Sequence, residues 1–406
     1  MSDMMKISKR QGVISKMLSE EMKVTESELC SGCGVCVTVC SVKALRLTSN
    51  EKGELYSEID PDKCIKCDKC TKVCPQNQTI KSNMPRKAFV AWSQEKQVRQ
   101  EAASGGVASA LYKYFASQNM KFAGVKIDEN MEAVFKIGSS LDDICDCKGS
   151  KYLFSKLFII IPEIMDLIRK QEKVLFIGLP CQVAALKKIT NFSEFLFCVD
   201  IVCHGVCSSK YLKEHIETVA KGKKVSKILF RDPEYGTNNF IFSLFEADNR
   251  IYKRGVDKND VYQLAYHKAL SYRENCYNCR YAKNERISDI TIGDYWGIGT
   301  VSNYNGERDN ISLVLCNTVQ GERLFIELVK DGCLFAEERP VTEPLKTEPQ
   351  LNHPSIKSKL CLELNEKIKQ TGRFELAARK VLRKKIILNY LIPVSFRRKI
   401  RKVLRG

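Results

Sequence analysis

The sequence predicts a small α+β module, then a larger α/β core with a mainly parallel sheet, and then a helical basic tail. Three observations lead to this fold class. Two identical cysteine runs stand between Cys30 and Pro75, short apolar strands alternate with helices from Lys173 onward, and cations crowd residues 367–406. A chain of 406 residues is long enough for two or three domains.

The cysteine runs define the first module. Each run has the spacing C-x2-C-x2-C-x3-C, and Pro75 closes the second one. This is the ligand run of a bacterial ferredoxin with two four-iron clusters, in which the last cysteine of each run binds the other cluster. We therefore predict a ferredoxin-like module with two ligand sets: Cys30, Cys33, Cys36 and Cys74 in one, and Cys40, Cys64, Cys67 and Cys70 in the other.

Two other uses of cysteine fit this pattern less well. Four-thiolate zinc sites do not need eight cysteines in two identical runs, and disulfide scaffolds belong to small secreted chains. The chain has 19 cysteines and no apolar signal segment at its N-terminus, so we expect a cytoplasmic protein with reduced thiols. Its longest apolar runs are too short to cross a bilayer.

Composition and pattern divide the chain into five parts. They are a polar segment at 1–29, the ferredoxin-like module at 30–80, two parts of the core at 85–170 and 171–345, and the basic helical tail at 346–406. The core begins with the apolar strand Ala88 to Trp92, which follows a polar link.

A glycine pair marks the first candidate binding loop of the core. Ser104, Gly105 and Gly106 precede a segment whose apolar residues share one helical face. Glycines at a helix start let a phosphate approach free backbone N–H groups, which the helix dipole favours. An ordinary helix start has the same residues, so the pattern leaves both interpretations open. Two strands, at 121–127 and 133–137, then predict a hairpin.

A second candidate loop follows that hairpin. Lys148, Gly149, Ser150, Lys151 and Tyr152 place two cations, a hydroxyl and an aromatic ring around a flexible glycine. That set suits a flavin that carries phosphates, although a surface turn could have the same composition. Two neighbouring thiols remain unassigned, Cys145 and Cys147.

From Lys173 onward, strands and helices alternate, which predicts a parallel sheet covered by helices. Ligands of such sheets bind beyond the carboxyl ends of the strands. Two of those ends carry Cys181 and Cys203. Further along the chain, Cys276 and Cys279 form a C-x2-C pair, which half a zinc site or a redox dithiol would also contain. We predict that these four cysteines hold a third four-iron cluster.

His204 is the candidate catalytic residue, because it adjoins Cys203 at a strand end and could donate a proton or a hydrogen bond to a flavin. A buried structural histidine would occupy the same position. Two other histidines fall in predicted helices and are expected to be structural, His215 and His267. The cysteines without ligand spacing are expected to be small buried residues: Cys198, Cys207, Cys316, Cys333 and Cys361.

The basic tail predicts a contact with an anionic surface. The formal net charge is +18, and residues 367–406 contain fourteen Lys and Arg against one acid, Glu375. Phe396, Ile400, Val403 and Leu404 recur at helical spacing among cations, as in a basic helix that lies on a membrane. Packing on the protein or on an acidic partner is the alternative. Nothing in the chain resembles a module that binds nucleic acid.

Five stretches together resemble one family. SGGVASAL, KGSKYLFS, FIGLPCQVAAL, VDIVCHGVCSS and CYNCRYAKNERISDITIGDYWGIG are similar, in this order, to the beta subunit of coenzyme F420 hydrogenases and dehydrogenases. The resemblance covers about residues 85–300. It implies an α/β core that binds FAD, often with its own cluster and with a fused ferredoxin module. It also implies FAD contacts for Ser104, Gly105, Gly106, Lys148, Ser150, Lys151 and Tyr152, and cluster ligation by Cys181, Cys203, Cys276 and Cys279.

The function that this resemblance implies is that of an iron–sulfur flavoprotein oxidoreductase. FAD would exchange electrons with coenzyme F420 or another two-electron substrate, and the clusters would connect it to a one-electron partner such as a ferredoxin or a larger redox enzyme. Some relatives resemble components of surface-polysaccharide pathways, which the basic tail would fit. The alternative is an electron-transfer subunit of a larger hydrogenase or dehydrogenase complex, with no substrate of its own.

Overall fold

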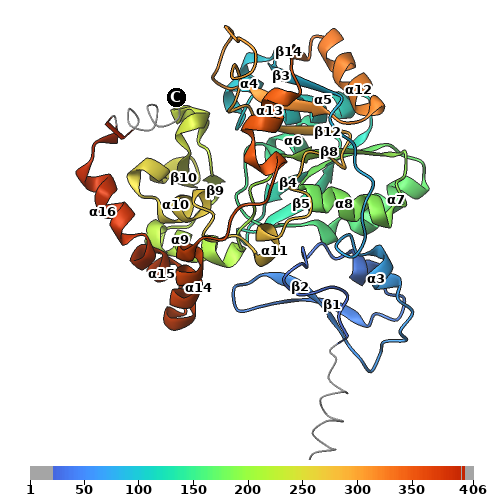
Figure 1. Ribbon diagram of the computed structural model, residues 1–406, viewed down its shortest axis with the longest axis horizontal. Helices are drawn as coiled ribbons and strands as arrows, with labels where there is room; N and C mark the ends of the chain where they lie inside the picture. The colour runs from blue at the N-terminus through green and yellow to red at the C-terminus, as the bar shows by residue number, and fades with distance from the viewer. Residues whose placement is uncertain (1–21, 395, 398–406) are drawn as a thin grey trace, which may run out of the picture.

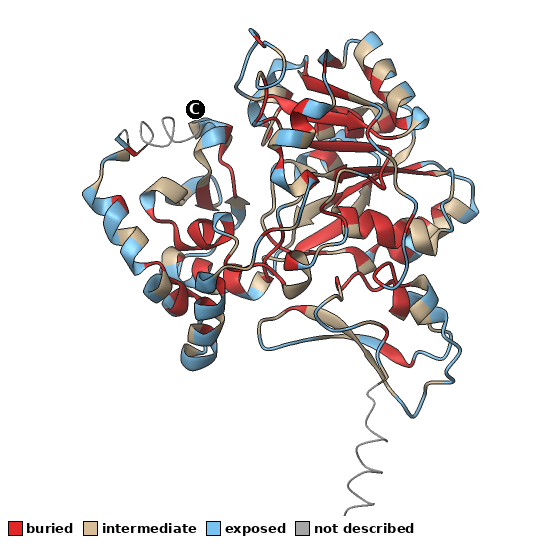
Figure 2. Cartoon of the chain, viewed as in Figure 1, coloured by how far each residue is buried: buried red, intermediate tan, exposed pale blue. Residues whose placement is uncertain are grey.

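The computed structural model describes residues 22–394, 396 and 397, which form three parts (Figure 1). The N-terminal module, blue in Figure 1, lies below a large mixed sheet with helices on both faces. A smaller lobe at the left contains a three-stranded sheet and the C-terminal helices. Figure 2 shows buried residues concentrated in the large sheet and in the centre of this lobe.

The N-terminal module contains a hairpin and two short helices. The strands β1 (Leu45–Ser49) and β2 (Leu55–Ile59) pair antiparallel, and the helices are α2 (Val35–Thr38) and α3 (Lys69–Val73). Only four apolar or cysteine side chains are buried in its own core, Val24, Cys36, Leu45 and Cys74. So small a core provides little hydrophobic stabilisation, and domains of this size usually depend on metals or on a larger neighbour.

Nine strands form the large sheet in the order β14-β3-β13-β12-β8-β7-β4-β5-β6. The central strands β12, β8, β7 and β4 run parallel, whereas antiparallel pairs lie toward both edges. The predicted parallel sheet is therefore confirmed at its centre, and the predicted hairpin is confirmed as β4 and β5. The strands are β3 (Lys87–Ser93), β4 (Lys121–Ile127), β5 (Ala133–Gly138), β6 (Ser155–Lys156), β7 (Val174–Gly178), β8 (Leu196–Ile201), β12 (Ile290–Asp294), β13 (Ser312–Cys316) and β14 (Leu334–Arg339).

Helices cover both faces of this sheet, so its central strands are continuously apolar. Side chains alternate along β7: Leu175 and Ile177 pack beneath α5 and α12, while Val174 and Phe176 pack against α7 and α8. The helices of this part are α4 (Lys96–Glu101), α5 (Val107–Ser117), α6 (Leu141–Cys147), α7 (Ile161–Arg169), α8 (Pro180–Ile189), α11 (Glu274–Tyr277), α12 (Val319–Lys330) and α13 (Thr342–Thr347), with the 3-10 turns η1 (Leu157–Ile159) and η5 (Pro349–Leu351).

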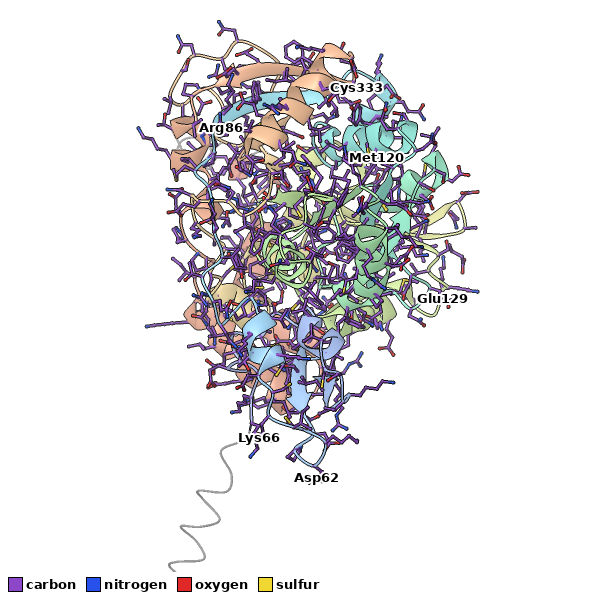
Figure 3. All side chains as sticks on the ribbon, turned by 90° about the vertical axis from the view of Figure 1, so that its right-hand side faces the viewer. Asp62, Lys66, Arg86, Met120, Glu129 and Cys333 are labelled. Atoms are coloured by element: carbon purple, nitrogen blue, oxygen red, sulfur yellow. The ribbon has the colours of Figure 1, made fainter. Side chains whose placement is uncertain are left out.

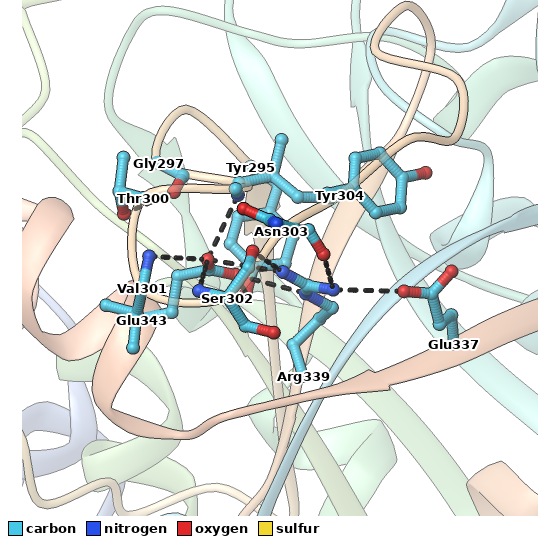
Figure 4. Close-up of polar contacts among 12 residues, drawn as sticks. Tyr295, Gly297, Thr300, Val301, Ser302, Asn303, Tyr304, Glu337, Arg339 and Glu343 are labelled. Atoms are coloured by element: carbon cyan, nitrogen blue, oxygen red, sulfur yellow. Dashed lines mark hydrogen bonds and ion pairs between the residues drawn. The ribbon is translucent and has the colours of Figure 1, made fainter.

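A buried carboxylate holds the loop that follows β12 (Figure 4). Glu343 accepts hydrogen bonds from the backbone N–H groups of Gly299 and Val301 at 3.0 and 3.1 Å, and from the Tyr295 hydroxyl at 2.8 Å. Arg339 pairs with the same carboxylate at 3.2 Å. This network fixes the turn that follows β12 and contains Tyr295 and Trp296.

The small lobe combines the sheet β11-β10-β9 with helices from two distant parts of the chain. The helix α10 covers Val261–His267. It begins after Asp260, which caps it by accepting a hydrogen bond from Gln263 N at 2.7 Å. The elements are β9 (Lys227–Leu229), β10 (Ile241–Glu246), β11 (Asn249–Gly255), α9 (Ser209–Ala220), α10 (Val261–His267), α14 (Lys359–Thr371), α15 (Phe374–Val381), α16 (Arg383–Leu391), η2 (Pro233–Tyr235), η3 (Thr237–Asn239) and η4 (Val256–Lys258).

The tail packs on this lobe through Leu364, Phe374 and Ala377, which are buried in the same apolar core as α9 and α10. Most of the predicted amphipathic helix lies outside the described residues. Of that segment, Phe396 is exposed, and Arg397 is buried with its Nη1 donating to Asn389 Oδ1 at 2.7 Å. Arg397 therefore binds the protein.

A buried histidine connects the tail to the rest of the lobe. His215 on α9 is fully buried, and its ring nitrogens lie 2.9 Å from Glu375 on α15 and 3.0 Å from Asp260 before α10. Burial alone would lower the pKa of His215, but the two carboxylates outweigh it and raise this pKa to about 9. His215 is thus structural, as expected, and stays protonated at neutral pH.

This ion cluster makes the stability of the lobe depend on pH. Because the folded-state pKa of His215 is raised from 6.5 to about 9, its contribution is fully present below pH 6.5 and is lost as pH rises through about 9. Over this window we expect the free energy of unfolding of the wild type to fall by up to roughly 3 kcal/mol more than that of His215→Gln. The unfolding temperature of the wild type should therefore fall more steeply. Scanning calorimetry at matched pH values checks this, and parallel pH dependences in the two proteins would contradict it.

Candidate iron–sulfur and flavin sites

The first ligand set of the N-terminal module surrounds one pocket. Cys30, Cys33, Cys36 and Cys74 all line it, together with the backbone of Gly34. Gly34 has a positive φ of 83° and allows a close approach, because a Cβ there would lie 2.5 Å from Phe158 Cβ of the core. The structure thus brings together the four cysteines that the crossed ferredoxin pattern assigns to one cluster, and seats them against the helices α7 and α8 that cover the large sheet. We call this pocket the inner site.

The second ligand set lies farther from the core. Cys40 and Cys70 are partly buried and pack against the small core of the module. Ala44 N donates to Cys40 Sγ at 3.2 Å. Cys64 and Cys67 stand on the loop that leads into α3, and the whole residue Cys67 is exposed. Figure 3 places Lys66, which lies between them, at the far end of the molecule from Cys333. We call this set the outer site.

The four cysteines predicted for the third cluster also converge. Cys181 and Cys203 follow the parallel strands β7 and β8, so they reach the same edge of the sheet, as the sequence predicted. Cys276 and Cys279 come from the segment around α11, and all four thiols line one cavity. Three separate segments therefore supply one site, which we call the core site.

Backbone N–H groups point at several of these sulfurs. Those of Tyr281 and Ala282 face Cys279, and that of Gly205 faces Cys203. Burial raises the pKa of the Cys33 and Cys276 thiols to about 12, so they would ionise at neutral pH only beside a positive charge such as that of bound iron. In the described part of the chain, no three Cys, His, Asp or Glu side chains converge on a position for a single metal ion. The inner and core cysteines each line a pocket instead, and the donor set fits four-iron clusters.

The inner and core sites are neighbours. Cys33 of the inner site and Cys181 of the core site are close enough to interact electrostatically, and Ser31 lines both pockets. The segment after Cys279 holds the two parts together: the Tyr281 hydroxyl donates to Pro75 O at 2.8 Å, and Arg280 donates to Gln76 O. The inner site is consequently the one through which the module faces the core.

The first candidate flavin loop is tied to the sheet. Ser104 Oγ donates to Ile311 O at 2.6 Å, and Gly105 N donates to Ser312 Oγ at 2.9 Å. Gly105 must be a glycine, because a Cβ there would lie 2.5 Å from the carbonyl oxygen of Ala91. Gly106 has a positive φ of 85° and stands at the N-terminus of α5. The loop therefore offers the first backbone N–H groups of α5, while the polar groups of Ser104 and Gly105 serve the fold.

The second candidate loop divides between two environments. Lys148 pairs with Glu101 at 2.8 Å, beside the first loop, and Gly149 is exposed with open space around its Cα. Lys151 instead donates to the carbonyl oxygens of Cys147 and Lys148 at the end of α6, and burial lowers its pKa to about 8. Ser150, between them, is half-buried.

Tyr152 belongs to an aromatic group of the small lobe. Its ring stacks on Tyr266 with centroids 4.5 Å apart and makes a T-shaped contact with the His267 ring, with centroids 5.5 Å apart. Tyr262 donates from its hydroxyl to Tyr152 O at 2.7 Å. Of the eight predicted flavin residues, the structure thus gathers the Ser104 loop and Lys148, and places Lys151 and Tyr152 in packing roles.

His204 lies at the cavity of the core site. It lines that cavity directly after Cys203, and its side chain is partly exposed to solvent. The surrounding protein lowers the pKa of His204, and Asp294 opposes that shift. A histidine that is mostly neutral and reachable from solvent is able to take up or release a proton next to the cluster ligands.

Four residues at the junction of module and core were not predicted: Ser31, Arg273, Arg280 and Tyr281. They flank ligand cysteines, and that position was the one signal that could have identified them.

Comparisons with known protein families agree with the cysteine pattern. A 4Fe-4S dicluster domain matches residues 29–78. The N-terminal part of the coenzyme F420 hydrogenase/dehydrogenase beta subunit matches residues 88–161, and its C-terminal part matches residues 171–341. The chain therefore contains a four-iron dicluster domain fused to both parts of one redox protein family.

The individual relatives have low sequence identity to this chain. The chain is 25% identical over 333 residues to a coenzyme F420-dependent sulfite reductase of Methanocaldococcus jannaschii, covering 74% of this chain and 46% of that protein. It is 23% identical over 259 residues to a coenzyme F420 hydrogenase subunit beta of Methanococcus voltae, covering 61% of this chain and 82% of that subunit. A chain of the F420-reducing [NiFe] hydrogenase complex of Methanosarcina barkeri aligns with 20% identity and a TM-score of 0.46, over 76% of this chain and 91% of that one.

The iron content of the protein checks the core site. Three four-iron clusters correspond to roughly twelve irons per chain in anaerobically purified protein, and Cys276→Ala should lower this to about eight. Cys145→Ala is the matched control, because Cys145 is exposed on α6 and should keep the full content. Iron and acid-labile sulfide assays measure both, and a Cys276→Ala protein with undiminished iron would remove the core site.

Proposed function

Because the chain belongs to the coenzyme F420 hydrogenase/dehydrogenase beta subunit family, we propose that this iron–sulfur oxidoreductase is a flavoprotein that passes electrons between a two-electron substrate and a one-electron partner. The convergence of Cys181, Cys203, Cys276 and Cys279 on one cavity, directly beside the inner site, carries this proposal. A cluster in that cavity would connect the α/β core electrically to the ferredoxin-like module.

The three sites lie in a definite spatial order for electron transfer. The core site adjoins the inner site through Cys181 and Cys33, and the inner site shares the small module with the outer site. The outer site is exposed at Cys67 and lies at the end of the molecule farthest from the large sheet. Electrons would thus pass between core and partner through the inner and then the outer cluster, with the partner docking at the loop around Lys66.

FAD, when bound, would supply the conversion between two-electron and one-electron transfer. We propose that its phosphates lie at the N-terminus of α5, where unpaired backbone N–H groups and the helix dipole favour an anion. Lys148 would turn from Glu101 to these phosphates, and Gly149 would leave room for them. Ser104 and Gly105 would keep this loop in place through their bonds to β13.

His204 is the residue that we propose for proton transfer. It stands at the cavity of the core site, its pKa is lowered by the surrounding protein, and solvent reaches it. A two-electron reduction of an organic substrate usually moves a proton as well, and His204 would exchange that proton with water.

The substrate class comes from the relatives. The sulfite reductase and the hydrogenase subunit are both named for coenzyme F420, so we propose a deazaflavin of that type or another two-electron carrier. The chain spans about half the length of the sulfite reductase, which has further parts. An electron-transfer subunit is the second candidate, and the exposed outer site favours it. Reduction of a two-electron acceptor by the isolated protein would exclude this alternative.

We also propose peripheral contact of the tail with an anionic membrane, which would fit a role beside a surface-polysaccharide pathway. Large apolar side chains of α16 are exposed, among them Leu388 at 45%, Tyr390 at 72% and Leu391 at 75%. Arg383 and Lys384 stand exposed on the same helix. Apolar side chains bordered by cations suit an anionic lipid surface. None of the helices in the described part of the chain has the length and apolar composition needed to cross a bilayer.

Flavin binding tests the central proposal. We expect about one acid-released FAD per chain in the wild type. Lys148→Ala should weaken FAD binding roughly ten- to a hundredfold, because a charge-assisted phosphate contact is lost. Glu101→Ala is the matched control: it breaks the same ion pair but frees Lys148, so binding should be kept or tightened. Fluorescence titration of the apoflavoprotein measures both. Wild-type protein that binds no FAD would overturn the flavoprotein assignment.

Flotation with vesicles tests the membrane contact. Full-length protein should float with vesicles rich in anionic lipid, and the double variant Leu388→Asn and Leu391→Asn should lose most of this binding. Ile356→Asn is the control, since Ile356 is exposed to 75% outside the tail helices α14–α16. Equal flotation of all three proteins would show that α16 makes no such contact.

A further inference from the structure

A buried arginine lies where the module meets the core. Arg273 is 3% exposed and stands just before Cys276. Its Nη2 donates to two carbonyl oxygens of the module, Leu55 O at 2.7 Å and Cys30 O at 3.3 Å. Its Nε donates to Asn275 Oδ1 at 3.2 Å, and the guanidinium lies 4.4 Å from the centre of the Phe154 ring.

This guanidinium has no acidic partner among the described residues. No carboxylate of the described chain lies within ion-pair distance, and Nη1 is buried without a hydrogen-bond partner. Glu54, next to Leu55, accepts from Asn50 Nδ2 at 3.1 Å instead. Arg286, which lines the same cavity, is by contrast neutralised by Asp200 at 2.8 Å.

An uncompensated buried charge is costly, so a structure that retains one normally supplies a counter-charge. The cavity of the core site is the space in which a negative counter-charge could lie. Arg273 lines the cavity of the core site, and it is close enough to Cys276 to act on it electrostatically. Its bond to Cys30 O also puts it against the first ligand of the inner site. The guanidinium thus stands between two sets of four thiols.

We propose that Arg273 is a positioning residue that supplies the shared counter-charge of the inner and core clusters and raises the reduction potentials of both. This inference rests on the cluster assignments of the proposed function. A four-iron cluster with four thiolates carries a net negative charge, which grows by one when it accepts an electron. A fixed cation nearby stabilises the reduced form more than the oxidised form, and the effect is strong where water is excluded.

The sharing matters for electron flow. If one cation acts on both clusters, their potentials move together, and the potential difference between them changes little. Each step transfers one electron from one cluster to the next, with no bond made and no proton moved. Arg273 also ties the module to the core through Leu55 and Cys30, so the same side chain fixes the distance across which that electron passes.

Potentiometric titration followed by EPR tests this proposal on the anaerobic, full-length holoprotein. Arg273→Gln should lower the potentials of two of the three clusters and leave the outer cluster unchanged. Cys276→Ala identifies which signal belongs to the core cluster. Arg273→Lys keeps the positive charge and should keep both potentials close to the wild type. Full iron content with unchanged potentials in Arg273→Gln would overturn the proposal, and so would an equal fall in Arg273→Lys.

Arg280→Gln is the matched control. Arg280 also donates to a carbonyl of the module, Gln76 O, but the residue is exposed, so water screens its charge. Its loss should leave the three potentials unchanged, whereas a fall as large as that in Arg273→Gln would assign the effect to docking alone and overturn the proposal.

A second variant covers the case in which Arg273→Gln does not assemble. Asn275→Asp is nearly isosteric and places a carboxylate on Nε, where it neutralises Arg273 and leaves its contacts in place. Both potentials should fall, and unchanged potentials would overturn the proposal. The titration needs only the clusters, so a protein that fails to bind FAD or to turn over substrate still decides it. A wild type with no cluster signals would instead refute the proposed function.

Discussion

The short segment from Arg273 to Ala282 is the constraint on which the rest of the structure depends. It supplies two of the core-site thiols, and its Arg273, Arg280 and Tyr281 bind carbonyl oxygens of the N-terminal module. The module has too few apolar side chains to hold a position by itself. Since the same residues build the core site and dock the module, the spacing between inner and core sites is built into one stretch of backbone.

Much of this arrangement could be predicted from local pattern. The two cysteine runs predicted the module, and strand–helix alternation predicted that Cys181 and Cys203 would reach one edge of the sheet. Both signals are short-range: ligand spacing follows from cluster geometry, and strand polarity follows from the crossover helix. The antiparallel edges formed by β3, β13 and β14 escaped prediction, because their pairing joins segments more than 200 residues apart.

The candidate flavin residues show where sequence reasoning reaches its limit. Tyr152 ends the second candidate flavin loop, yet it packs against the aromatic core of the small lobe. Arg273 had no pattern of its own, since a single arginine before a C-x2-C pair is compatible with any surface. Its importance comes from burial without a counter-charge, which appears only when the module and the core are assembled. Composition likewise identified the basic tail but did not show that Arg397 would be buried.

The exposure of Cys67 determines where oxygen first damages the protein. Iron–sulfur clusters are destroyed by oxygen most readily where solvent reaches them, and exposed thiolates are the first to oxidise. The outer site is exposed at Cys67, whereas the inner site is buried at Cys33, Cys36 and Cys74. Damage should therefore begin at the outer site. Loss of the outer cluster would leave the inner and core sites in place but remove the exposed end of the proposed electron path.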